Sequence, residues 1–190
     1  MALAKVLEIE TGIPSFAVPT NGMHDYVYGA GIAFEEIAKR FVTEKETREN
    51  HVKQIVNLLG ITPLDFGPIS KVEELKKNLE QYGWKIISTW AMGDTLEDLS
   101  NAGNAEVNLV VSSVGLRAAR ALKEKYGTPY VIGTPYKEYA ERISEALEKR
   151  IRLPALEDRG KENLQGTGNS EKIITLIGEP VTTTSLAALI

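Results

Sequence analysis

The chain of 190 residues contains no cysteine and only two histidines. Without cysteine it cannot form a disulfide bond, a thiolate zinc site or an iron–sulfur cluster held by its own thiolates. The histidines, His24 and His51, lie far apart in the sequence, and neither has a partner at metal-ligand spacing. The sequence therefore predicts no metal site.

Long apolar runs, an excess of positive charge and an export signal are also absent. No apolar stretch approaches the ~18 residues that a membrane-spanning helix needs. The net charge of −4 is unlike the basic balance of a general nucleic-acid surface. The N-terminus has Lys5 and then acidic residues in place of the apolar core of a signal peptide. We expect a cytoplasmic protein that binds neither nucleic acid nor a membrane.

Common motifs of cofactor binding and nucleophilic catalysis are missing too. Gly29 and Gly31 are followed by Phe34 where a GxGxxG motif needs its third glycine, and they follow a loop rather than a strand. The segments GKEN and GTGNSEK lack the GxxxxGK[ST] frame of a phosphate-binding loop. A Gly-x-Ser-x-Gly stretch is absent as well. No residue is predicted to be catalytic.

What the sequence does contain is a regular alternation of buried strands and amphipathic helices, clearest around residues 107–132. Residues 107–111 are a mainly apolar run, typical of a strand buried on both faces. Ser112 ends this run, an amphipathic helix follows, and Gly127 stands where a left-handed residue would close that helix. Residues 129–132 are the next strand. This β-α-β pattern predicts parallel strands joined by a right-handed connection.

The same alternation extends over residues 51–152 and specifies the fold class. Further strands are expected at 52–59 and 84–89. Helices are expected from a capping box at Ser70 and Glu73 to residues 82–83, from a capping box at Asp94 and Glu97 through Leu99, and at 136–151. The predicted fold is α/β, a three-layer sandwich with a mainly parallel sheet.

We divide the chain into four parts. Residues 51–152 are expected to form a complete α/β domain, and residues 153–170 a polar, glycine-rich linker. Residues 1–47 are expected to end a preceding domain, with a helix tail closed near Gly12, a strand at 15–18, a loop and a helix at 32–41. Residues 171–190 are expected to begin a following domain with a strand at 172–178 and a partial helix. We therefore expect a fragment of a longer protein.

The carboxyl edge of the predicted sheet is the expected ligand site. In an open parallel sheet, ligands bind at the carboxyl ends of the strands, near the point where the strand order reverses. The loops at these ends are 60–69, 90–95, 112–115 and 133–136. Single residues such as Asp65 are more simply explained by turn formation and core packing. Because four loops converge, the edge as a whole favours a binding site.

Several segments are specific enough to suggest a family. VNLLGITPLDFG, STWAMGDTLEDLSNAGNAEVNLVVS, SVGLRAARALKEKYGTPYV and the terminal IITLIGEP resemble the nitrogenase component 1 family. That family includes nitrogenase catalytic subunits, cofactor-assembly scaffolds and dark-operative protochlorophyllide reductase subunits. The resemblance implies subunits of three Rossmann-like α/β domains around a metallocluster or a tetrapyrrole. It also implies electron delivery from an ATP-dependent iron–sulfur reductase.

The chain departs from this family at the positions that hold metal. Cofactor-bearing nitrogenase subunits have a cysteine ligand after the matching strand, where this chain has Ser112, and a hydroxyl does not replace a thiolate on soft iron. The loop NGMHDY matches a region in which some members place a cofactor-proximal histidine, here His24; an exposed loop histidine is the alternative. The residues expected to line a ligand pocket are Asn21, Gly22, His24, Thr62, Trp90, Ser112 and Ser113.

Two functions stay open on the sequence. The first is a piece of a nitrogenase-like oxidoreductase subunit that passes low-potential electrons to a metallocluster, a tetrapyrrole or another small substrate. The second is a non-catalytic scaffold or cofactor-assembly module that pairs with a homologous subunit or with a second copy of itself. In both cases we expect this chain to bind no cofactor by itself, although the full-length protein could hold an iron–sulfur or related metallocluster.

The absence of cysteine leads to a direct prediction. Anaerobic reconstitution of the chain with iron and sulfide, followed by desalting, should leave no stoichiometric cluster, because no thiolate is present to hold it. Iron and sulfide analysis and visible absorption measure the result. A stable chromophore at one cluster per chain would contradict the prediction.

Overall fold

The computed structural model describes residues 2–43, 54–150 and 175–189. Its centre is a sheet of four parallel strands in the order β2-β1-β3-β4. The strands are β1 (Ile55–Leu59), β2 (Lys85–Ser88), β3 (Val107–Val110) and β4 (Tyr130–Ile132). The predicted α/β class with a parallel sheet is confirmed.

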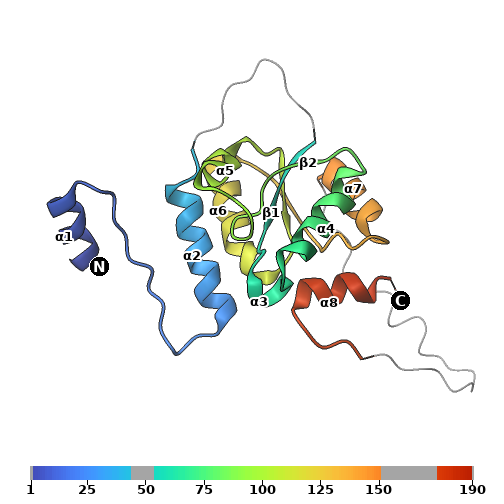
Figure 1. The fold of residues 1–190 in the computed structure, drawn as a ribbon, viewed down its shortest axis with the longest axis horizontal. Coiled ribbons are helices and arrows are strands. Elements are labelled where there is room, and N and C mark those ends of the chain that lie inside the picture. The colour runs from blue at the N-terminus through green and yellow to red at the C-terminus, as the bar shows by residue number, and fades with distance from the viewer. Residues whose placement is uncertain (1, 44–53, 151–174, 190) are drawn as a thin grey trace, which may run out of the picture.

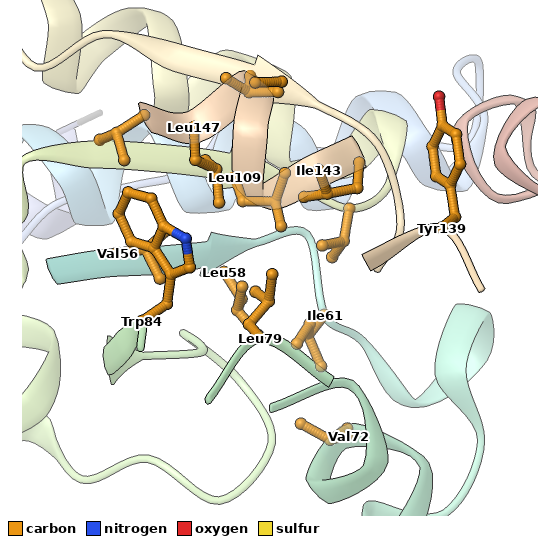
Figure 2. Close-up of a cluster of buried hydrophobic side chains, with 14 residues drawn as sticks. Val56, Leu58, Ile61, Val72, Leu79, Trp84, Leu109, Tyr139, Ile143 and Leu147 are labelled. Atoms are coloured by element: carbon orange, nitrogen blue, oxygen red, sulfur yellow. The ribbon is translucent and has the colours of Figure 1, made fainter. Parts of the chain in front are cut away.

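Helices cover both faces of the sheet and make the three predicted layers (Figure 1). One face is covered by α4 (Ile69–Glu80) and α7 (Ala140–Lys149). The other is covered by α6 (Leu116–Tyr126), against which α2 (Tyr26–Arg40) packs. Figure 2 shows the first core, where Leu79 and Leu147 of the two helices meet Leu58 and Leu109 of the strands. Each such fully buried leucine contributes about 1.5–3 kcal/mol to stability.

On the sheet face that α6 covers, hydrogen bonds between buried polar side chains join three strands; we call this set the polar ladder. The Asn57 side chain of β1 donates to Asn108 Oδ1 of β3 at 2.7 Å and accepts from Ser88 Oγ of β2 at 2.7 Å. It also donates to the carbonyl oxygen of Ala102 at 2.9 Å, in η1 (Asn101–Asn104). Asn57 is paired in register with both strand neighbours. A slipped register would leave buried polar groups unpaired at about 1–3 kcal/mol each, so the ladder selects one alignment.

The N-terminal part agrees with the prediction at one point and differs at two. α1 (Ala2–Thr11) ends as expected at Gly12, whose φ is +68°. Residues 15–18 form no strand, so that prediction is wrong. α2 begins at Tyr26 instead of residue 32, because the Asp25 side chain accepts from the Tyr28 amide at 2.8 Å and caps the helix. Gly29 and Gly31, which the prediction assigned to the loop before the helix, lie inside this helix.

Two further helices begin differently from the prediction. α4 follows Pro68 with no side-chain cap, so the capping box of Ser70 and Glu73 is wrong and both residues lie inside the helix. α7 begins at Ala140 instead of residue 136, after a turn at 137–139. The alternation of strands and helices located both helices, but it did not locate their first turns.

The second capping box is displaced by one residue. α5 (Leu96–Ser100) is capped by Thr95 and Asp98 instead of Asp94 and Glu97. Asp94 turns back to accept from the amide of Trp90 at 2.7 Å and from that of the preceding Thr89 at 2.5 Å. The loop at 89–94 therefore takes the carboxylate that the sequence pattern assigned to the helix.

The C-terminal segment forms the expected helix but not the expected strand. α8 (Pro180–Ala187) is present, whereas the described residues 175–178 of the expected strand 172–178 carry no strand pairing. The predicted linker 153–170, the domain boundary near residues 47–51 and His51 lie outside the described residues. Within the described ranges, no helix combines the length and the apolar character that crossing a membrane requires.

Two glycines let the segments after β1 and β3 touch. Gly60 has a φ of +99°, and a Cβ there would lie 2.9 Å from the Gly115 amide nitrogen. A Cβ on Gly115 would lie 2.3 Å from the Leu59 carbonyl oxygen. Such an approach is possible only without a side chain. The two turns therefore depend on glycine for their contact.

This contact can be tested by adding one methyl group. Gly115→Ala should lower the free energy of unfolding by at least about 3 kcal/mol, the upper end of overpacking costs, because backbone atoms must move. Gly22→Ala is the matched control: a Cβ there meets nothing within 4 Å, and the change should stay within about 0.5 kcal/mol. Urea unfolding measures both, and equal stabilities would contradict the close approach.

Candidate functional site

The sheet reverses its strand order between β1 and β3, and the segments that follow these strands meet at the carboxyl edge. After β1 come Thr62 and the short helix α3 (Pro63–Phe66). After β3 come Ser112 and the turn η2 (Ser113–Gly115), which leads into α6. Open α/β sheets bind ligands at such a switch point. The structure therefore contains the switch point at which the ligand site was predicted, and that a ligand binds there stays a prediction.

Asp65 of α3 is the centre of a hydrogen-bond network at this edge. Its Oδ2 accepts from Ser112 Oγ at 3.1 Å and from Thr62 Oγ1 at 3.2 Å. Ser112 Oγ also lies 2.9 Å from the Gly60 carbonyl oxygen, so its one proton is shared between two acceptors. The Tyr26 hydroxyl of α2 donates to Thr62 Oγ1. The network therefore joins α2 to the loops after β1 and β3.

Glu179 joins the C-terminal segment to the same edge. Its Oε1 accepts from the Ser113 amide at 2.7 Å and from Ser113 Oγ at 2.6 Å, while Oε2 accepts from the Thr182 amide at 2.8 Å and caps α8. Ser185 of α8 accepts from the Thr134 amide, after β4, at 2.9 Å. These bonds place α8 below the carboxyl edge (Figure 1).

The two carboxylates give the edge a distinct electrostatic character. Burial raises the pKa of Asp65; the hydrogen bonds from Ser112 and Thr62 oppose this rise, and the charge of Glu179 adds to it. Burial, followed by the charge of Glu179, also raises the pKa of the Tyr136 phenol. The edge therefore favours a protonated carboxyl group at Asp65 more than water does.

A groove of about 760 Å³ lies beside this edge, between α2 and α6. Ser113 and Arg117 line it on one side, and His24, Tyr28 and Glu35 on the other. The His24 and Tyr28 ring centroids are 4.0 Å apart. The Arg117 guanidinium lies 4.8 Å from the Tyr28 ring centroid and pairs with Glu35 at 3.2 Å. The groove offers aromatic faces and both signs of charge, at a size typical of small-molecule sites.

The predicted pocket residues are divided among four places. Thr62 and Ser112 are buried and joined through Asp65. His24 and Ser113 line the groove. Asn21 and Gly22 lie exposed in the loop before α2, where Asn21 Oδ1 accepts from the Met23 amide at 2.9 Å. Trp90 lies in the core. The structure brings four of these residues to the edge or its groove and leaves three outside.

Trp90 packs into the core between the sheet and α2. Its side chain is 3% exposed and meets the Phe34 ring edge-on, with centroids 6.0 Å apart. Its φ is +74°, a conformation that costs a bulky residue about 1–3 kcal/mol, and Asp94 holds it. The indole Nε1 has no hydrogen-bond partner in the described part of the chain. Core packing is thus the role that the structure supports for Trp90.

Sequence reasoning missed the residues that link these groups. Asp65 stood in a loop that the topology had marked, but a turn explained it as well. Tyr26 was assigned to a loop, although Asp25 three residues before Tyr28 was a usable capping signal. Glu179 precedes Pro180, and proline is favoured at the first position of a helix, so this glutamate could have been predicted as a cap. Its reach to Ser113 depends on the tertiary fold.

Comparison with known proteins matches this chain to one family. The family model described as nitrogenase component 1 type oxidoreductase matches residues 2–163. The chain belongs to this family. The resemblance proposed from the sequence segments is confirmed.

Curated relatives give the same assignment over parts of the chain. A light-independent protochlorophyllide reductase subunit of Chlorobium phaeobacteroides (strain BS1) is 36% identical over 105 residues, which cover 54% of this chain and 19% of that protein. The corresponding reductase subunit of Nostoc punctiforme is 37% identical over 84 residues, which cover 44% of this chain and 16% of that protein. The matched residues of this chain therefore span about a fifth of the length of such relatives.

The solved structure of nitrogenase Cp1 at pH 5 resembles the chain in fold. Its TM-score is 0.53 at 24% identity, with 69% of this chain and 26% of that chain covered. The parallel sheet and its helices therefore follow the architecture of a nitrogenase component.

An iron–sulfur cluster ligated by this chain does not fit the donors that these residues offer. Soft iron is held by thiolates, and the chain has no cysteine. Ser112 directs its hydroxyl to Gly60 and Asp65. Within residues 2–43, 54–150 and 175–189, no three His, Cys, Asp or Glu side chains are grouped to hold a metal ion. That the chain binds no cluster stays a prediction.

The pKa of Asp65 predicts a pH dependence of stability. Because the pKa is raised in the folded state, Asp65 contributes stability that is present below its ordinary pKa of about 3.9 and lost as pH rises through the folded value. Asparagine at position 65 cannot titrate. The free energy of unfolding of Asp65→Asn relative to wild type should therefore increase as pH rises from the ordinary pKa through the folded pKa of Asp65. Urea unfolding across a pH series measures the difference.

Asp98 provides a control of opposite sign. Hydrogen bonds from the Thr95 backbone and side chain lower the pKa of Asp98. Its stabilisation is therefore present above the ordinary pKa and lost as pH falls. Asp98→Asn should become less stable relative to wild type as pH rises. Parallel pH curves for the Asp65 and Asp98 variants would contradict the environment assigned to Asp65.

Proposed function

We propose that the chain is part of a component 1-type oxidoreductase subunit that delivers low-potential electrons to a tetrapyrrole or another small unsaturated substrate. The observation that carries this proposal is the groove between α2 and α6, which opens beside the hydroxyl and carboxylate network at the switch point. The relatives that are protochlorophyllide reductase subunits favour a tetrapyrrole as the substrate class.

The groove residues suit the chemistry of a tetrapyrrole acid. A flat conjugated ring stacks on aromatic faces such as the paired rings of His24 and Tyr28. A carboxylate substituent pairs with a guanidinium, and Arg117 and Arg120 both line the groove. Ser113 stands where the groove meets the carboxyl edge. The substrate would thus lie with its ring on α2 and its acid group toward α6.

In this proposal, groups outside this chain carry out the electron-transfer steps. A reductase that removes a double bond needs electrons, protons and a site from which water is excluded. An ATP-dependent iron–sulfur reductase supplies the electrons in this proposal, through a cluster held elsewhere in the full-length assembly. This chain contributes the pocket wall, the polar contacts and the carboxyl groups at the edge.

A non-catalytic scaffold is the second candidate, and a different observation favours it. α1 exposes apolar residues at helical spacing, with Leu3 72%, Val6 52% and Leu7 47% exposed. One apolar stripe of this kind is typical of a helix that packs on a partner. In this case the chain would pair with a homologous component 1 subunit, and the groove would hold no substrate.

Binding of protochlorophyllide distinguishes the two candidates. Anaerobic titration of the purified chain, followed by pigment absorption and tryptophan quenching, should give saturable binding at one pigment per chain. Arg117→Ala should weaken it by about tenfold, the loss expected for one charge-assisted contact of about 1.5 kcal/mol. His24→Ala should weaken it through lost stacking. Arg142→Ala, on α7 across the sheet, is the matched control and should bind like wild type.

The possible outcomes of this titration distinguish a tetrapyrrole pocket from a non-catalytic scaffold. Absence of saturable binding by the wild-type chain would rule out a tetrapyrrole pocket made by these residues. Binding that is equal in wild type and Arg117→Ala would place the pigment outside the groove. Absence of pigment binding together with a defined complex with a component 1 partner in sedimentation velocity would support the scaffold.

A further inference from the structure

One asparagine of the sequence is followed by glycine, and it lies in the loop before α2. Asn21 and Gly22 are both exposed, and Met23 after them is 87% exposed. Every other asparagine of the sequence is followed by a residue that carries a side chain. The difference matters chemically, because the peptide nitrogen that follows an asparagine can attack its side-chain amide, and only glycine leaves this nitrogen without a neighbouring Cβ.

The surroundings of Gly22 leave room for this attack. Apart from the chain neighbours of Gly22, a Cβ built on it would meet no atom within 4 Å. Among the residues that the structure describes, none accepts a hydrogen bond from the Gly22 amide. The buried Asn57 is the opposite case, because its side-chain amide is held by Ala102 and Asn108. The Gly22 nitrogen is therefore accessible to water and to the side chain before it.

The Asn21 side chain is already folded toward the peptide that would attack it. Its Oδ1 accepts from the Met23 amide at 2.9 Å, which closes a turn around Gly22. The Gly22 peptide lies inside the ring that this hydrogen bond closes. The same hydrogen bond polarises the side-chain carbonyl group and directs a donor at the oxygen atom on which negative charge develops during attack. The loop thus combines an unhindered nucleophile with a polarised electrophile.

We propose that Asn21 is a self-modifying site, which converts to aspartate and isoaspartate through a succinimide and thereby alters the mouth of the groove between α2 and α6. Water is the only co-reactant. The conversion does not depend on the proposed function, because it involves no ligand of the groove.

The reaction exchanges one water molecule for one ammonia molecule and transfers no electron. The Gly22 nitrogen gives its proton to water and forms a bond to Asn21 Cγ. The bond from Cγ to the side-chain nitrogen breaks, and this nitrogen leaves as ammonia with a proton from water. Water then opens the succinimide by breaking one of its two bonds to the Gly22 nitrogen. Breaking the bond from Cγ gives aspartate, and breaking the bond from the main-chain carbonyl carbon gives isoaspartate.

The conversion acts on the groove because two groove residues follow the site directly. Met23 and His24 line the groove, and the His24 ring centroid lies 4.0 Å from that of Tyr28. Both products place a carboxylate at position 21, near Asp25, which already caps α2. Isoaspartate also lengthens the main chain by one carbon atom and removes the side-chain turn that holds Met23. His24 should therefore lose its fixed position against Tyr28.

Mass spectrometry of the aged chain tests the modification. The whole chain is kept in warm, mildly alkaline buffer made with water enriched in heavy oxygen, and samples are digested at intervals. The peptide that contains Asn21 should change by the mass of amide-to-acid conversion with one heavy oxygen, and isoaspartate-specific methylation should label it. Asn101 is also exposed but is followed by Ala102, so it is the internal control and should keep its amide.

Gly22→Ala is the matched variant for the chemistry. It places a Cβ beside the attacking nitrogen but meets no other part of the fold, so urea unfolding should show an unchanged midpoint. The conversion of Asn21 should slow by at least about tenfold, which corresponds to about 1.4 kcal/mol on the barrier. Equal rates in wild type and Gly22→Ala, or equal rates at Asn21 and Asn101, would overturn the self-modifying site.

Proton NMR of the His24 ring tests the effect on the groove, with His24→Gln identifying the signal. In wild type, the ring signal should move toward that of a solvent-exposed histidine as Asn21 converts. In Gly22→Ala aged for the same time, it should stay in place. Conversion of Asn21 without a change at His24 would overturn the link to the groove. Neither readout uses a pigment, so failure of pigment binding would not affect this result.

Discussion

The close contact between the turns that follow β1 and β3 is the constraint on which the rest of the structure depends. Gly60 and Gly115 bring two backbones so near that a Cβ on Gly115 would lie 2.3 Å from the Leu59 carbonyl oxygen. This contact allows Ser112 to reach both the Gly60 carbonyl oxygen and Asp65. Without it, the two loops would present separate hydroxyls instead of one network. The side chains of the candidate site therefore come together only because the two backbones pack closely.

The same edge shows how burial turns ordinary residues into a chemical environment. Threonine, serine and tyrosine hydroxyls bind one another and the partly buried carboxyl group of Asp65, where reduced contact with water strengthens each hydrogen bond. Glu179 brings a second carboxylate and is itself satisfied by Ser113 and Thr182. At this edge the pKa of Asp65 is raised by burial, and Glu179 and Ser185 hold helix α8 beside it.

Family membership and site chemistry carry different parts of the functional argument. The family accounts for the parallel sheet and its helices. Within this chain, Ser112 directs its hydroxyl to the Gly60 carbonyl oxygen and Asp65. The network of Asp65 is a property of this chain's own residues. Substrate chemistry therefore has to be tested through the groove and the edge.

Fold class was predictable because it depends on periodicity, which is local. The apolar runs of β1 and β3, the helical spacing of α6 and the left-handed Gly127 are each readable over a few residues. The carboxyl edge was predictable as the meeting place of the loops because the strands of β-α-β units run parallel. Thr62, Ser112 and Ser113 were placed there by this reasoning, whereas His24 came from the family resemblance of its loop, and their role as site residues stays a prediction. The first turn of α5 was less predictable, since the loop before it competed with the helix cap for the Asp94 carboxylate.

By itself, the sequence determined the four strands of the central sheet, their parallel direction and the absence of thiolate ligands. Only the tertiary structure decided that Trp90 packs in the core, that Tyr26 opens α2 and that Glu179 reaches Ser113. The physical reason is distance along the chain. Tyr26 and Thr62 are 36 residues apart, and Ser113 and Glu179 are 66 apart. Hydrogen bonds between such positions have no local signature, because they exist only after the sheet has brought its loops to one edge.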